Sequence, residues 1–339
     1  MKRVSIKDVA REAGVSTATV SYVLNSTPLQ SISAETTARI REAVSRLNYV
    51  PNLNARSLAS RRTSLIGVVI PQTEPGKEFL FSNPFYGDLL SSAEYTARQN
   101  GYHLLLSGSE PGQSYMNIAR NRGVDGIIIV GAYPTKWLDE LHELAIPVVL
   151  VDTYAKDPAF HTIGIDDRLG GRMATEYLIR HGHRDIAFVS GQMEEHGVVQ
   201  KRFQGYRDAL DAAGITFSHE RLYLGSISFE YAQSVAAEMV RRGRRETAAF
   251  ATADILGMGL IKGLHLLGIH VPNDVSIVGF DDVDLARMCD PSLTTVQQDI
   301  AAKGTKAIRF ILDALGGKAE KQEQILPIRI VERESVRTL

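Results

Sequence analysis

The sequence predicts a small all-α domain followed by an α/β region of two lobes, each built on a doubly wound parallel sheet. Three short helical patterns occupy the first fifty residues, and from Leu65 onward short apolar strands alternate with longer amphipathic helices. The length of 339 residues exceeds what one ordinary core accommodates. We therefore expect a helical domain at 1–50, a linker at 51–62 and a two-lobed domain at 63–339.

Each of the three predicted helices has a start or stop signal. Ser5 precedes Asp8 by three positions, which is a capping pattern, and Gly14 ends the first helix. Ser16 caps the second helix, and Ser33 opens the third. Apolar residues recur at helical spacing in all three helices: Ile6, Val9, Ala10, Ala13, Val20, Val23, Leu24, Ile40, Val44 and Leu47.

The first two helices and the tight turn between them form a helix-turn-helix pattern. With its apolar residues turned inward, the second helix presents short or polar side chains outward, and such a helix can approach base edges in the major groove. We expect three residues to read bases: Thr17, Ala18 and Tyr22. Four others suit contact with phosphate, with helix capping as the open alternative: Ser5, Ser16, Thr19 and Ser21.

The charge distribution favours a nucleic-acid partner for the N-terminal part alone. Residues 1–62 carry ten Lys or Arg and four acids, a net charge of +6. The other residues carry 28 basic and 35 acidic side chains, a net charge of −7. A basic segment on an acidic body fits a polyanion, and a merely solvated basic face is the alternative.

The linker predicts a helix that needs a partner. Asn52 is a capping residue for the stretch up to Ser60, which holds only about two helical turns. An isolated helix of that length is marginal in water, so we expect it to order only against another surface.

The strands of the α/β region fall into two groups. They are expected near 65–70, 102–107, 126–130 and 148–151, and near 186–189, 248–252 and 275–280. A break near residue 162, with crossing segments near Thr294 and the C-terminus, divides the region into two similar lobes. We expect one lobe to comprise 63–162 with 292–324, and the other 163–291 with 325–339.

Acidic residues follow several of these strands. In open parallel sheets ligands lie beyond the carboxyl ends of the strands, and Asp152, Asp254 and Asp281 stand there. A carboxylate accepts two hydroxyl hydrogen bonds, and several carboxylates together disfavour an anion, so a neutral sugar is the expected ligand. Asp254 also precedes a helix, and helix capping is its alternative role.

Composition excludes several other classes. Cys289 is the only cysteine, so an intramolecular disulfide is impossible and a cysteine-based zinc site is not expected. The first residues lack the apolar core of a signal peptide, and no apolar stretch is long enough for a membrane span. We expect a cytoplasmic protein without cofactor or metal, and interpret His181-Gly182-His183 as a helix end and turn.

Residues 4–25 resemble the N-terminal domain of the LacI/GalR family of bacterial repressors. The resemblance continues through 47–52, 55–59, 66–71, 279–282 and 291–296. It implies a periplasmic-binding-protein-like sensor and a homodimer on a near-palindromic double-stranded operator. It also implies that the linker folds as a helix in the minor groove with Leu58 wedged between base pairs and three residues around it: Asn52, Ala55 and Arg56.

The same resemblance implies an effector site. Carried over position by position, the strongest candidates are Asp152, Arg202 and Asp281, although Arg202 has structural pairing with an acid as its alternative. Weaker lining candidates are Gln298, Asp254, Ile227, Phe85 and Tyr133. Effector binding is expected to reorient the lobes and so to stabilise or melt the paired linker helices.

Two departures from the family pattern bear on specificity. Tyr22 stands where many relatives carry Arg or His, and tyrosine lacks the bidentate guanine fork. The segment between Ser107 and Asp125 is shorter than in many relatives, so no relative's effector transfers directly.

The sequence disfavours two other functional classes. An α/β enzyme acting on a sugar is disfavoured because the chain has no P-loop and no Gly-x-Ser-x-Gly motif, and the glycines of 257–263 have the wrong spacing. A sugar-binding module without DNA regulation is disfavoured by the basic helical domain.

Overall fold

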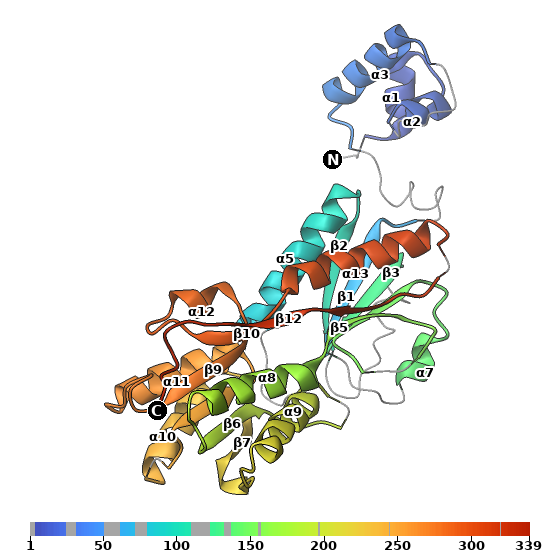
Figure 1. Ribbon diagram of the computed structural model, residues 1–339. Coiled ribbons are helices and arrows are strands. Elements are labelled where there is room, and N and C mark those ends of the chain that lie inside the picture. The colour runs from blue at the N-terminus through green and yellow to red at the C-terminus, as the bar shows by residue number, and fades with distance from the viewer. Residues whose placement is uncertain are drawn as a thin grey trace. The chain divides into compact units, whose positions relative to one another are not determined.

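The computed structural model describes residues 4–24, 32–50, 62–71, 80–109, 123–131, 137–154, 157–195, 197–243, 245–318 and 320–339. The chain divides into two compact units, Met1–Thr63 and Ser64–Leu339 (Figure 1). Each unit is described separately below.

The first unit is the predicted helix-turn-helix domain. It contains α1 (Ile6–Ala13), α2 (Thr17–Leu24) and α3 (Ala34–Arg46). Gly14 ends α1 in the left-handed conformation with φ of 65°, and the Ser33 hydroxyl accepts a hydrogen bond from the Thr36 amide, as the sequence predicted. The three helices share a core in which Val9, Val20 and Ile40 are fully buried.

The second unit contains two six-stranded sheets. The first runs in the order β11-β5-β4-β3-β1-β2, and all its neighbouring strands are parallel. Its strands are β1 (Leu65–Pro71), β2 (His103–Ser109), β3 (Gly126–Val130), β4 (Val148–Val151), β5 (His161–Ile165) and β11 (Glu323–Leu326).

The second sheet repeats this arrangement. It runs in the order β12-β10-β9-β8-β6-β7, and only β12 is antiparallel to its neighbour. Its strands are β6 (Ile186–Gly191), β7 (Leu222–Gly225), β8 (Ala248–Ala251), β9 (Ser276–Asp281), β10 (Thr294–Gln298) and β12 (Ile328–Val331). Since β2-β1-β3-β4-β5 and β7-β6-β8-β9-β10 have the same connectivity, the prediction of two similar doubly wound lobes is confirmed.

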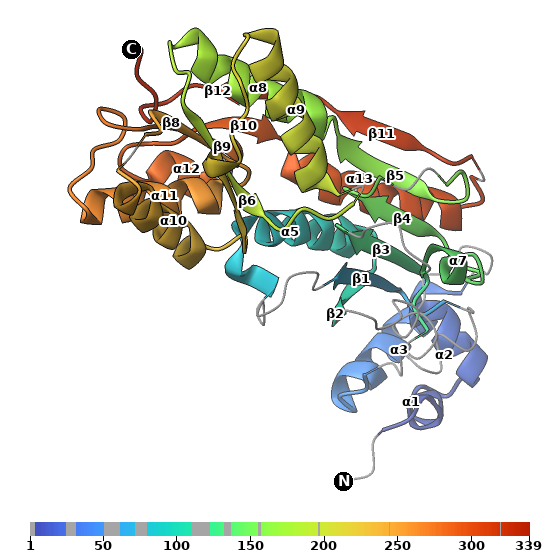
Figure 2. The same cartoon turned by 90° about the horizontal axis from the view of Figure 1, so that it is seen from below.

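Helices cover the faces of both sheets. The first lobe carries η1 (Leu80–Ser82), α5 (Pro84–Gln99), α7 (Trp137–Leu141) and α13 (Ile300–Leu315), with α13 packed along α5. The second lobe carries α8 (Asp167–Arg180), α9 (Val198–Ala212), η2 (His219–Arg221), α10 (Phe229–Arg241), α11 (Asp254–Leu266) and α12 (Asp284–Met288). Figure 2 shows the second sheet between the α8–α9 pair and the α10–α11 pair.

In the described ranges the chain crosses between the lobes after β5, after β10 and between β11 and β12, and these points differ in detail from the expected division. β5 extends the first sheet to Ile165, and the first crossing leads from there into α8. β10 pairs with β9 in the second sheet, so the return to the first lobe begins after Gln298 and not at 292. The sequence analysis placed a crossing segment near Thr294, and the apolar pattern there does not reveal which sheet a buried strand joins.

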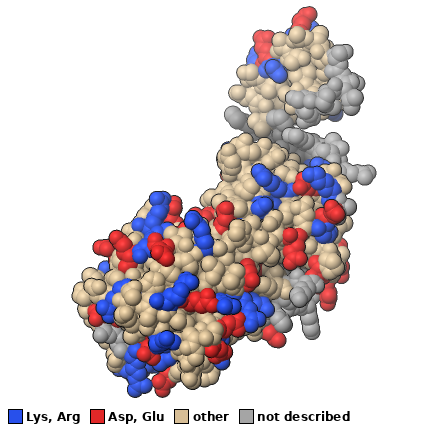
Figure 3. Space-filling view, viewed as in Figure 1, with Lys and Arg blue, Asp and Glu red and all other residues tan. Residues whose placement is uncertain are grey.

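The surface of the second unit mixes both signs of charge. On the face shown in Figure 3, basic and acidic side chains are interspersed over this unit. Within the described ranges, no helix has the length and apolar character that crossing a membrane requires.

The crossing of α8 over α9 depends on two glycines. A Cβ atom added at Gly205 would lie 1.9 Å from the carbonyl oxygen of Arg168, and one at Gly171 would lie 2.1 Å from that of Arg202. Only glycine permits this approach of two backbones, and it brings the start of α9 against the start of α8.

We expect Gly205→Ala to lower the free energy of unfolding by about 1–3 kcal/mol, because the new methyl group must push two backbones apart. Urea unfolding of the purified protein measures this. Gly87→Ala in α5 is the matched control, since nothing lies within 4 Å of its added Cβ. That helical substitution should be neutral or stabilising by up to about 1 kcal/mol. Equal stability of the two variants would contradict the close crossing.

Candidate functional site

The outward face of α2 carries the three predicted base-reading residues. Thr17 and Ala18 are exposed, and Tyr22 is 37% exposed, whereas Val20 on the opposite face is fully buried. This face of α2 is therefore accessible to a DNA groove, and the contacts of the three residues with bases stay predictions.

The candidate phosphate contacts take part in local bonds. The Ser5 amide donates to Oδ2 of Asp8 at 2.9 Å, and the Ser5 hydroxyl donates to the same oxygen at 2.6 Å. The Ser16 hydroxyl accepts from the Thr19 amide at 3.1 Å and lies 2.8 Å from the Thr19 hydroxyl. Ser21 is half-buried. Ser5 and Ser16 therefore make hydrogen bonds at the starts of their helices, and their contacts with phosphate stay predictions.

Several sequence-predicted residues lie outside the described part of the chain. They are the linker residues Asn52, Ala55, Arg56 and Leu58, and the effector-lining candidate Tyr133.

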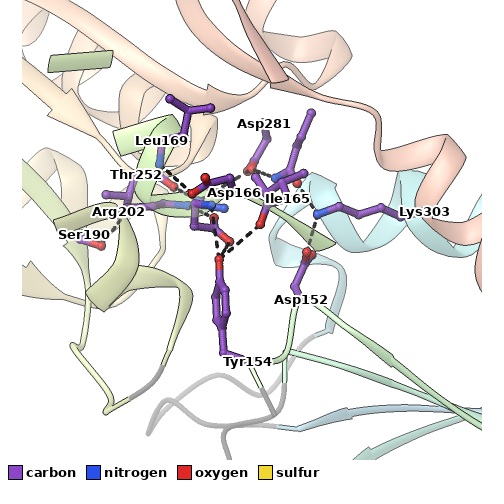
Figure 4. Close-up of polar contacts among 12 residues, drawn as sticks. Asp152, Tyr154, Ile165, Asp166, Leu169, Ser190, Arg202, Thr252, Asp281 and Lys303 are labelled. Atoms are coloured by element: carbon purple, nitrogen blue, oxygen red, sulfur yellow. Dashed lines mark hydrogen bonds and ion pairs between the residues drawn. The ribbon is translucent and has the colours of Figure 1, made fainter. Parts of the chain in front are cut away.

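Three effector-site candidates, Asp152, Asp281 and Gln298, belong to one polar network between the lobes. Figure 4 shows Asp152 and Asp281 of this network together with Lys303 and Arg202. Asp152 follows β4 of the first lobe, whereas Asp281 ends β9 and Gln298 ends β10 of the second lobe. Gln298 donates from Nε2 to Oδ1 of Asp281 at 2.5 Å. The carboxyl-end rule applied to the sequence therefore located residues that the fold brings together.

Lys303 of α13 joins Asp152 to this pair. Its ammonium donates to Oδ1 of Asp152 at 2.5 Å and also donates to Oε1 of Gln298. The Lys303 side chain is fully buried, and its ammonium lies 5.5 Å from the centre of the Phe85 ring. Phe85, one of the weaker lining candidates, therefore lies beside the Lys303 ammonium.

Arg202 of α9 continues the network in the second lobe. Its Nε donates to Oδ1 of Asp167 at 2.7 Å, and its Nη1 donates to the carbonyl oxygen of Thr252 at 2.5 Å. Nη1 lies 4.0 Å from Oδ1 of Asp281, and the guanidinium lies 3.6 Å from the centre of the Phe280 ring. These contacts hold the guanidinium plane in one orientation.

Tyr154 links the network back to the first lobe. Its hydroxyl donates to Oδ2 of Asp167 at 2.7 Å and accepts from the Asp167 amide at 3.3 Å. Tyr154 follows β4, whereas Asp167 opens α8 beyond the first crossing. The polar network therefore spans both lobes.

The network carries an excess of negative charge. Three carboxylates, Asp152, Asp167 and Asp281, stand against the two cations Arg202 and Lys303, so the formal sum is −3 + 2 = −1. Burial raises the pKa of Asp152 despite the opposing charge of Lys303. Burial likewise raises the pKa of Asp281 to about 6, although Arg202 opposes it.

Three polar atoms of the network remain open. Among the described residues, Oδ2 of Asp152, Oδ2 of Asp281 and Nη2 of Arg202 have no hydrogen-bond partner. Asp152 and Asp281 also have positive φ angles of 52° and 119°, and each stands at the carboxyl end of a strand. Strained backbone at such positions is typical of binding sites.

The remaining candidates differ in their placement. Both carboxylate oxygens of Asp254 are occupied, since Oδ2 accepts from the Val283 amide at 2.9 Å and Oδ1 accepts from the Thr295 hydroxyl at 2.6 Å. Burial and then the charge of Asp281 raise the pKa of Asp254 well above its ordinary value. Ile227 is half-buried beyond the end of β7 and packs against the main hydrophobic core.

A separate cavity of about 660 Å³ adjoins the second crossing. Of the effector candidates it includes only Gln298. The acidic residues that line it are Asp88, Asp282, Asp284 and Asp299.

Sequence reasoning missed Lys303, Asp167 and Tyr154. One signal pointed to Lys303, because it lies three positions after Ile300 and four before Ala307 on the apolar stripe of α13. A lysine on a buried stripe requires a partner. No comparable signal marks the other two.

No group of three or more His, Cys, Asp or Glu side chains suited to a metal ion occurs in the part of the chain that the structure describes.

A helix-turn-helix unit followed by two α/β lobes with polar groups converging between them defines a transcription regulator with an effector domain. The family profile described as "Bacterial regulatory proteins, lacI family" matches residues 5–52, and "Periplasmic binding protein-like domain" matches residues 175–336. The chain belongs to the LacI family of DNA-binding transcription regulators, and it is not an enzyme.

Similar proteins agree over the full length. The HTH-type transcriptional repressor PurR of Vibrio atlanticus is 33% identical over 99% of each chain. A structure of the lac repressor dimer bound to operator and the anti-inducer ONPF has a TM-score of 0.86 at 26% identity, covering 99% of this chain and 100% of that one. A complex of the regulator CelR with cellobiose has a TM-score of 0.70 at 28% identity, covering 98% and 100%.

The raised pKa of Asp281 predicts a pH-dependent effect of Asp281→Asn. Because the folded-state pKa of about 6 exceeds the ordinary value of 3.8, the stabilising contribution of Asp281 is fully present below the lower value and is lost as the pH rises through the higher one. Asparagine has no such titration, so the variant should gain about 3 kcal/mol of unfolding free energy relative to the parent across this range.

Urea unfolding of both proteins at several pH values measures this difference. Asp313→Asn is a matched control, since Asp313 lies on the far part of α13 and pairs with Lys318 at the surface. A pH-independent difference between parent and Asp281→Asn would contradict the burial of an ionising carboxyl at this position.

Proposed function

We propose that this protein is a repressor whose affinity for operator DNA is controlled by a neutral sugar bound between the two lobes. The observation that carries the proposal is the set of three open polar atoms on Asp152, Asp281 and Arg202, within a network that has a negative formal charge. The lac repressor and CelR structures, with their operator, ONPF and cellobiose, support the same kinds of partner.

The ligand class follows from the chemistry of these atoms. Two carboxylate oxygens accept hydrogen bonds, and one guanidinium nitrogen donates. A sugar hydroxyl both donates and accepts, so neighbouring hydroxyls of one ring suit both kinds of partner. An anionic ligand meets repulsion, because each cation of the described network already has a carboxylate partner.

The DNA-binding half combines the exposed face of α2 with the linker. We propose that Thr17, Ala18 and Tyr22 contact base edges in the major groove, while the basic side chains of residues 1–62 contact phosphates. A homodimer on a near-palindromic operator would place two such helices about one helical turn apart. The linker helix would then order in the minor groove, with Leu58 between base pairs.

Effector and operator are coupled through the orientation of the lobes. A ligand bonded to Asp152 in one lobe and to Arg202 in the other stabilises one relative orientation of the lobes. An effector that favours paired linker helices acts as a co-repressor, and one that favours separated helices acts as an inducer.

Fluorescence anisotropy with labelled duplexes from the DNA flanking its own gene tests the proposal. Binding should weaken steeply with added salt, because phosphate contacts release counterions. One neutral sugar of a mono- and disaccharide panel should change the affinity by about 5–150-fold, the range of ordinary allosteric coupling. Affinity that responds to no neutral sugar, or only to phosphorylated ones, would contradict the effector assignment. Turnover of a sugar would contradict the functional class.

We expect Leu58→Ala to weaken binding to the specific duplex by about tenfold or more, because the wedge that unstacks the central base step is lost. Binding to an unrelated duplex should change little, since it depends on phosphate contacts. Leu53→Ala in the same linker is the matched control and should leave specific binding unchanged. Equal losses in the two variants would show that the linker has no particular wedge residue.

A further inference from the structure

We propose that Lys303 determines the charge class of the effector: paired with Asp152, it offers no positive charge to a ligand, and this pairing excludes anionic metabolites. The inference rests on the proposed function, since it concerns the same inter-lobe site. It assigns a specificity-determining role to a residue that the sequence candidates did not include.

The Lys303 ammonium donates two hydrogen bonds and lies near an aromatic ring. The two acceptors are Asp152 and Gln298, and the centre of the Phe85 ring lies 5.5 Å from the ammonium. The side chain is fully buried, so no water replaces these contacts. Lys303 therefore contacts Asp152 and Gln298, and we infer that it presents no donor to the ligand.

Asp152 separates Lys303 from the ligand. Its Oδ1 accepts from Lys303, while its Oδ2 stays open, so the residue uses one oxygen for the lysine and keeps the other for a hydroxyl. The charges that act on Asp152 come from three helices: Lys303 of α13 and Arg202 of α9 oppose its protonation, and Asp167 of α8 favours it. Asp281 of β9 also interacts with it.

Neutralising Asp152 should reverse the selectivity. Asparagine keeps the shape of the side chain and tolerates the positive φ of 52° at this position. The formal charge of the network becomes −2 + 2 = 0, counting Asp167 and Asp281 against Arg202 and Lys303. Lys303 is then a buried cation without a carboxylate partner, and an anion that enters the site supplies the missing charge.

Inorganic phosphate is the probe for this change. We expect no difference in the melting temperature of the full chain between phosphate and chloride at matched ionic strength. Asp152→Asn should gain about 2–4 °C once phosphate exceeds its dissociation constant several-fold. The double variant Asp152→Asn with Lys303→Met should lose this gain, because no unpaired cation remains.

The comparison of the single with the double variant isolates the site, since phosphate bound elsewhere shifts both equally. Lys306→Met in the Asp152→Asn background is the matched control, one turn further along α13, and should keep the response. Equal phosphate shifts in Asp152→Asn and the double variant would overturn the inference while leaving the neutral-sugar proposal intact. A phosphate shift in the parent protein that Lys303→Met abolishes would overturn both.

A second measurement covers the case in which Asp152→Asn fails to fold. In Lys303→Met alone, Asp152 is a buried carboxyl without its cation, so its folded-state pKa should rise further and stability should fall as the pH rises. The double variant has no carboxyl there and should not show this additional pH dependence. Parallel melting-temperature profiles of the two variants against pH would show that Lys303 and Asp152 are not electrostatically coupled, and would overturn the inference.

Discussion

Arg202 keeps a full positive charge in a place almost closed to water, and much of the inter-lobe geometry follows from that constraint. Its side chain donates to Asp167 and to the carbonyl oxygen of Thr252, and it lies against the Phe280 ring. Removing an unpaired ion from water costs several kcal/mol, so a buried guanidinium needs an acidic partner and further polar contacts. The first turn of α8 and the ends of β8 and β9 are therefore fixed relative to α9. The glycine contact between α8 and α9 makes this approach sterically possible.

The features that the sequence predicted well are those with local signals. Helix caps involve residues a few positions apart, so Ser5, Gly14, Ser16 and Ser33 delimited the helices of the first unit. The carboxyl end of each apolar strand can also be identified in the sequence. Ligands of parallel sheets lie beyond these ends, and this rule located Asp152 and Asp281. The neighbour of a buried strand is not local information, which is why the return to the first lobe was expected from 292 although β10 still pairs with β9.

The residues that the sequence did not reveal act through tertiary contacts. Asp166 and Asp167 are adjacent and chemically alike, yet Asp166 caps α8 through the Leu169 amide while Asp167 turns inward to Arg202. One-dimensional patterns cannot separate such a pair. Lys303 differs, because its place on the apolar stripe of α13 predicts burial, and burial of a lysine predicts an acid nearby. The identity of that acid, 151 residues away in the sequence, required the fold.

The polar contacts of Tyr154 and Lys303 connect the two lobes at the points where the chain crosses between them. Tyr154 and Lys303 belong to the first lobe, and each bonds a residue at a crossing point, Asp167 just after β5 and Gln298 just before α13. Both contacts lie at these crossings, where a reorientation of the lobes would change the backbone angles. In the proposed mechanism, a ligand bonded to Asp152 on one side and to Arg202 on the other would favour one orientation of the lobes. Because linkage is reciprocal, operator binding would then change the affinity for that ligand by the same factor by which the ligand changes operator affinity.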